Sequence, residues 1–107
     1  MKAECNTRVK GMIGFARRAG KCIIGTELIC RALPKGEVRL VVVSATASAP
    51  TKKKLTVKCD FYGVKHVEST IDTDGLGSLV GKSSSVAAVA ITDDAFASEI
   101  IKAVVGE

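Results

Sequence analysis

Residues 38–43 read Val-Arg-Leu-Val-Val-Val, a run rich in β-branched side chains with turn-type residues close to both ends. Nearly continuous apolarity of this length is typical of a β-strand that is covered on both faces. Residues 86–91 read Val-Ala-Ala-Val-Ala-Ile and have the same character. The two runs predict a central sheet buried between two other layers.

Helical periodicity surrounds these two strands. A first helix is expected from an N-cap at Asn6 or Thr7 to a stop at Gly20. A second is expected from a cap at Thr26, with Leu28 counted on its buried face. The pattern further predicts helices at 49–62, 74–80 and 94–104 and short strands at 22–24 and 64–67.

Strands and helices alternate along all 107 residues, without a linker or a repeat. Alternation of this kind predicts an α/β fold, a three-layer α/β/α sandwich on a four-stranded, mixed and mainly parallel central sheet. The length is close to that of one domain, so residues 1–107 are expected to form a single domain.

Charge is distributed unevenly between the two halves of the chain. Residues 1–54 carry twelve Lys and Arg against three Glu, whereas residues 55–107 carry four Lys against eight Asp and Glu. A sign split within one domain favours a positive face suited to a phosphate backbone. Aromatic residues make up only 4%, which counts against a platform of rings that stacks bases.

Composition argues against several other classes of protein. No apolar run approaches the ~20 residues that a membrane helix needs, and we expect neither a signal peptide nor a membrane anchor. The four cysteines lack Cys-x-x-Cys spacing and only one His is present, so neither a metal site nor a cofactor is expected. Reduced, mostly buried thiols in a cytoplasmic protein are the preferred interpretation.

Catalytic motifs are not evident. His66 lacks a partner in any recognisable motif and is interpreted as structural. Asp93 and Asp94 are explained by helix capping, and the glycines between Gly75 and Gly81 do not have the spacing of a phosphate-binding loop. The sequence therefore indicates a protein that is not an enzyme.

A glycine turn provides the best candidate binding site. Gly25 and Thr26 precede a helix, whose first N–H groups would be free to meet a phosphate. Arg31 follows more than a turn later, within reach of a neighbouring phosphate or base edge. Three basic residues near this turn in sequence complete the candidate set: Arg17, Arg18 and Lys21.

A series of motifs then runs in order along the chain: Met12-Ile13-Gly14-Phe15-Ala16-Arg17-Arg18-Ala19-Gly20-Lys21, Gly25-Thr26-Glu27-Leu28-Ile29-Cys30-Arg31-Ala32, Thr51-Lys52-Lys53-Lys54, Leu79-Val80-Gly81-Lys82-Ser83 and Ala90-Ile91-Thr92-Asp93-Asp94-Ala95-Phe96. Together they resemble the bacterial YlxQ family of ribosomal or RNA-binding proteins, from Thr7 to Ala103. That family belongs to the superfamily of ribosomal proteins L-seven-Ae and L-thirty-e, which have an α/β/α sandwich fold.

The resemblance implies where RNA would bind. Many members of the superfamily recognise kink-turns in RNA through the glycine turn and the loop before the last strand. These regions correspond here to Gly25, Thr26, Glu27 and Arg31, and to Lys82, Ser83 and Ser84 in the loop. Kink-turn readers carry Asn-Glu after the turn, whereas this chain has Glu27-Leu28, which removes an amide and an acceptor for guanine edges.

The sequence thus leads to a ranked set of functional hypotheses. The first is a monomeric protein that binds structured RNA, ribosomal or kink-turn-like, in association with the ribosome and its proteins. The second is a protein-interaction module of the ribosome or RNA-processing machinery. The third is a partner that recruits RNA in trans for a modifying enzyme.

Overall fold

The computed structural model describes the backbone of residues 2–105 and the side-chain surroundings of residues 7–104. Its helices are α1 (Lys2–Arg18), α2 (Thr26–Ala32), the 3-10 turn η1 (Leu33–Lys35), α3 (Ala49–Tyr62), α4 (Thr73–Leu79) and α5 (Asp94–Val105). Its strands are β1 (Cys22–Ile24), β2 (Leu40–Val43), β3 (Lys65–Glu68) and β4 (Ala88–Ile91).

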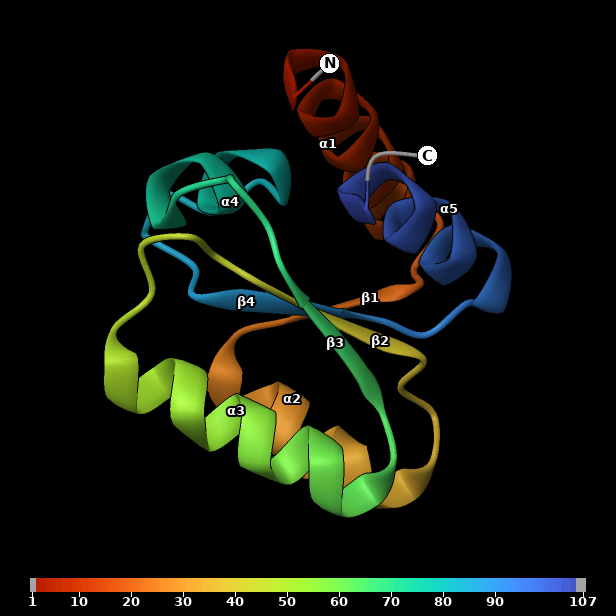
Figure 1. Ribbon diagram of the computed structural model, residues 1–107, viewed down its shortest axis with the longest axis vertical. Helices are drawn as coiled ribbons and strands as arrows, with labels where there is room; N and C mark the ends of the chain where they lie inside the picture. The colour runs from red at the N-terminus through yellow and green to blue at the C-terminus, as the bar shows by residue number, and fades with distance from the viewer. Residues whose placement is uncertain (1, 106–107) are drawn as a thin grey trace.

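Three layers are visible in Figure 1, where α1, α4 and α5 lie on one face of the sheet and α2 and α3 on the other. The predicted α/β/α sandwich is thereby confirmed. All four residues of β2 and all four of β4 are buried. The two apolar runs in the sequence are therefore the central strands.

The alternating direction of side chains along the two central strands explains why these strands are apolar throughout. Leu40 and Val42 pack with the cluster formed by α1, α4 and α5, whereas Val41 and Val43 pack with the cluster formed by α2 and α3. Successive side chains of a strand point to opposite faces, so a strand covered on both sides has no position for a polar residue.

The strand order is β1-β4-β2-β3, and the sheet is mixed. The prediction that it is mainly parallel is wrong, because β4 pairs antiparallel with both β1 and β2 and only β2 and β3 pair in parallel. The physical reason is the long connection from β3 to β4. Glu68 at the end of β3 and Ala88 at the start of β4 both pair with Val43, so the chain between them stays at one end of the sheet and β4 must run back.

Element boundaries differ from the sequence-based expectations mainly at helix starts. The first helix begins at Lys2, so neither Asn6 nor Thr7 is its N-cap. Gly25 rather than Thr26 is the N-cap residue of α2, with φ 98° and ψ 145° and no side-chain capping bond. Ser48 and Asp93 do cap their helices, since their side chains accept hydrogen bonds from the N–H groups of Thr51 and Phe96.

Candidate nucleic-acid interface

The two segments selected by sequence, the β1–α2 turn and the loop before β4, meet at one end of the sheet. Ile24 of β1 pairs with Val89 of β4. One residue further, the Gly25 N–H donates a hydrogen bond to the Ala88 carbonyl at 3.2 Å. The φ of 98° at Gly25 lies where side-chain-bearing residues are strained, so the turn itself requires glycine.

The loop before β4 is fastened to α4 by its backbone. The N–H of Lys82 bonds to the Gly77 carbonyl at 2.9 Å, and the N–H of Val86 bonds to the Thr73 carbonyl at 3.0 Å. Gly77 also packs directly against the Ser84 carbonyl oxygen, leaving no room for a Cβ atom. These contacts hold the loop in one position, while the side chains of Lys82, Ser83 and Ser84 remain exposed.

Arg17 supports this loop from α1. Its Nε donates a hydrogen bond to the Val80 carbonyl at 2.9 Å. Its guanidinium also lies beside Gly81, where a Cβ atom would be 3.5 Å from an Arg17 nitrogen. Arg17 was predicted only as a candidate RNA-binding residue, and the structure shows that it also holds the loop in position.

The outward face of α2 carries three different side chains. Glu27 and Arg31 are exposed and lie one helical turn apart. Leu28, expected on the buried face, is 53% exposed, whereas Ile29 and Ala32 face the core. Because α2 has only seven residues, its dipole contributes little, and the candidate site depends on the junction of the turn and the loop rather than on the helix end.

Of the other predicted residues, Lys21 lies apart from this junction and Arg18 makes a contact within α1. Lys21 is at the other end of β1, where its carbonyl accepts a hydrogen bond from the Thr92 N–H at 3.0 Å. The guanidinium of Arg18 lies over the ring of Phe15 at 4.9 Å, a cation–π contact. Phe15 is 53% exposed and was not predicted as a surface residue. Its position outside the apolar stripe of α1 was the signal that could have indicated its exposure.

The cysteines lack the features of reactive groups. Burial raises the pKa of Cys22 to about 11, with the Arg17 guanidinium acting in the opposite direction. Burial and the neighbouring Asp60 carboxylate raise the pKa of Cys59 to about 11. Cys59 is buried, but Cys22 and Cys30 are only half-buried, so the prediction of mostly buried thiols is wrong for these two. Cys5 lies outside the described side chains.

Two kinds of feature are absent from the described part of the chain. It contains no group of three or more His, Cys, Asp or Glu side chains that could hold a metal ion. None of its helices combines the length and the apolarity that a membrane span requires.

The fold and the junction define a small α/β/α domain with a preorganised turn-and-loop surface. More particularly, the chain belongs to the Ribosomal protein L7Ae/L30e/S12e/Gadd45 family, whose model matches residues 7–101. The resemblance expected from the sequence motifs is therefore confirmed.

Two relatives are proteins named RNA-binding protein YlxQ. The one from Bacillus subtilis (strain 168) is 38% identical over 92 residues, which cover 84% of this chain and 88% of the relative. The one from Enterococcus faecium is 33% identical over 90 residues, which cover 84% of each chain. Both names describe RNA-binding proteins and not enzymes.

Two solved structures have the same fold. A protein of unknown function from Bacillus halodurans C matches with a TM-score of 0.83 and 28% identity, over 91% of this chain and 96% of that one. The Giardia lamblia 15.5kD RNA binding protein matches with a TM-score of 0.77 over 94% of this chain and 85% of that one. At 18% identity, the second match shows the fold alone.

Proposed function

We propose that this protein binds structured RNA at the junction between the β1–α2 turn and the loop before β4. The observation that carries the proposal is the hydrogen bond from Gly25 to Ala88, which joins two segments more than sixty residues apart into one surface. The YlxQ proteins, which cover most of the chain at 33–38% identity, are named as RNA-binding and support the same function.

The exposed side chains at the junction suit an RNA ligand. Arg31 and Lys82 are donors for phosphate oxygens, and the serine hydroxyls of the loop add uncharged donors. Glu27 is repelled by phosphate but accepts hydrogen bonds from the amino groups of bases. The proposed complex therefore places Arg31 and Lys82 on the backbone and Glu27 at a base edge.

A fixed loop favours an RNA of fixed shape. The bonds of Lys82 and Val86 to α4 and the Arg17 contact leave little conformational freedom to be lost on binding. We propose a folded RNA, such as an internal loop of ribosomal RNA, as the target. Since Glu27-Leu28 replaces the Asn-Glu pair of kink-turn readers, we expect a ribosomal fragment to bind more tightly than a standard kink-turn.

Fluorescence anisotropy with three RNAs of equal length tests this proposal: a kink-turn, a plain duplex and a fragment of ribosomal RNA. Arg31→Ala and Lys82→Ala are each expected to weaken binding by at least about tenfold, the effect of one charged hydrogen bond. The matched control is Lys35→Ala, an exposed cation that lies in η1, outside the junction. Equal losses for all three variants would mean that only the overall charge matters and would refute the assigned site.

A further inference from the structure

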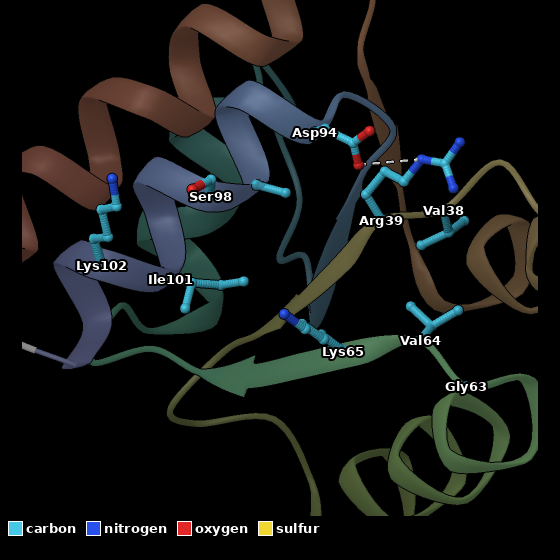
Figure 2. Close-up of a pocket in the computed structure, with 10 residues that line it drawn as sticks. Val38, Arg39, Gly63, Val64, Lys65, Asp94, Ser98, Ile101 and Lys102 are labelled. Carbon is cyan, nitrogen blue, oxygen red and sulfur yellow. Dashed lines mark ion pairs between the residues drawn. The ribbon is translucent and has the colours of Figure 1, made fainter.

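A groove of about 520 Å³ lies between α5 and the start of β3. Figure 2 shows the apolar side chains of Val38, Val64 and Ile101 directed toward it from the segments that precede β2 and β3 and from α5. The groove is at the end of the sheet opposite the proposed RNA site, because Lys65 pairs with Leu40 and Leu40 with Ile91, whereas Ala88 lies at the far end of β4.

Cations surround the apolar floor. Lys65 extends from β3 into the space below α5 (Figure 2), and no ion-pair partner for it is found among the described residues. Arg39 at the rim is 3.4 Å from Asp94, but both side chains are largely exposed, so this ion pair is weak and easily exchanged. Three cations and one carboxylate line the groove, so its lining stays positively charged even though one of the cations, Lys102, is also 3.7 Å from the Glu99 carboxylate.

The strand beside the groove has a free edge. β3 is the last strand of the sheet and pairs only with β2 among the described strands. An edge strand presents unpaired N–H and C=O groups that an added strand can use. Next to Gly63 at the groove margin, Phe61 is 80% exposed and Tyr62 40% exposed, so apolar surface continues beyond the floor.

We propose that this groove binds an extended, acidic segment of a partner protein. Its backbone pairs with the free edge of β3, an apolar side chain rests on Val64, and a carboxylate on the other face of the added strand meets Lys65 below α5. A second carboxylate replaces Asp94 as the partner of Arg39. Charge complementarity selects an acidic ligand. The apolar floor and the free strand edge select a polypeptide over RNA, because phosphate groups neither pack on apolar side chains nor pair with a strand.

The groove and the proposed RNA site lie at opposite ends of the sheet. Because RNA is expected at the Gly25–Ala88 end and the acidic segment at the Leu40–Ile91 end, one copy of the chain holds both at once. The protein then links a folded RNA to an acidic protein. This inference stands apart from the proposed RNA function, since either site can fail without the other.

The experiment uses a fluorescein-labelled peptide of alternating Glu and Val, which as a strand presents Val on one face and Glu on the other. We expect saturable anisotropy, together with NMR shifts of the Gly63, Lys65 and Ser98 amides. Lys65→Glu should weaken binding at least about tenfold. Val64→Thr, which keeps the shape of the floor but adds a hydroxyl, should weaken it as well.

Controls separate the groove from general charge effects. Lys53→Glu makes the same charge reversal on the exposed face of α3 and should leave peptide binding unchanged. A peptide of alternating Lys and Val should not bind. No shift of the groove amides, equal binding of the Lys peptide, or displacement of the Glu peptide by RNA would each overturn the proposal. RNA affinity of Lys65→Glu equal to that of Lys53→Glu would support two separate sites.

Discussion

Gly77 controls the position of the loop before β4 through the side chain that it lacks. A Cβ atom at this residue would overlap the Ser84 carbonyl oxygen, which belongs to backbone and cannot rotate away. We expect Gly77→Ala to lower the free energy of unfolding by about 1–3 kcal/mol, the cost of overpacking a buried site. Urea denaturation measures this change, and RNA binding should weaken in parallel because the loop must move.

Gly11 and Gly14 provide the matched controls for that substitution. Both lie in α1, and a Cβ atom at either would have no neighbour within 4 Å. Replacing either with Ala should raise the free energy of unfolding by about 0.5–1 kcal/mol, since Ala loses less backbone entropy in a helix. A similar loss of stability for Gly77→Ala and Gly14→Ala would contradict the role given to Ser84.

The half-buried Cys22 thiol and the buried Cys59 thiol predict how stability changes with pH. Cys22 and Cys59 have pKa values raised from 9.0 to about 11 in the folded chain. Below pH 9 the thiols are protonated in both states and the full stability is present. Between about pH 9 and 11 the unfolded thiols ionise first, so stability falls as the pH rises.

Unfolding midpoints measured from pH 8 to pH 11 test this expectation. Lysines also titrate in that range, so the comparison is made with a variant carrying both Cys22→Ala and Cys59→Ala. Its loss of stability with pH should be shallower than that of the wild type, whatever its stability at pH 8. Parallel curves for the two proteins would show that the thiols do not contribute.

The surroundings of the candidate site residues were only partly predictable, and Arg17 illustrates the limit. Its basic character suggested a phosphate contact, but its Nε is bound to Val80, 63 residues away. Leu28 fits the helical spacing of apolar residues, yet α2 turns it outward. Both outcomes depend on how distant segments pack, and local periodicity contains no information about that.

At the level of elements, the sequence predicted helix boundaries correctly where a neighbouring residue determines them. The helix predicted at 49–62 is present as α3, where Ser48 caps the start and Gly63 adopts the left-handed conformation that ends the helix. The direction of β4 was not predictable in this way. It follows from the return of the chain after β3 to the end where β4 starts.

The Ser48 cap leads to a prediction for α3. Its side-chain oxygen accepts the Thr51 N–H at 3.3 Å, so Ser48→Ala should lower the free energy of unfolding by about 1 kcal/mol. Ser48→Asp should restore most of the loss, because Asp is an equally good N-cap. Thermal unfolding followed by circular dichroism measures both changes. An unchanged midpoint for Ser48→Ala would mean that solvent satisfies the helix start equally well.

On the scale of the whole molecule, the sheet separates two surfaces of different character. The end with Gly25 and Ala88 carries a glycine turn and a hydrophilic loop, both fixed by backbone hydrogen bonds. The other end carries an apolar groove with cations at its rim. In Figure 1 the antiparallel β4 runs between these two ends through the middle of the sheet. A rigid sheet of this kind keeps the two surfaces at a constant separation.

Salt should affect RNA binding and folding very differently. Two to four phosphate contacts at the junction predict that log K falls against log salt with a slope of roughly −1.5 to −3.5, because bound RNA releases counterions. Arg31→Ala should make that slope shallower by somewhat less than one. Folding depends on the buried core and on exposed ion pairs such as Arg39–Asp94, so its salt dependence should stay below about 1 kcal/mol. Anisotropy titrations and urea denaturation at the same salt concentrations measure both quantities. An RNA affinity that does not change with salt would exclude phosphate contacts by Arg31 and Lys82, because every such contact releases counterions and is weakened by salt.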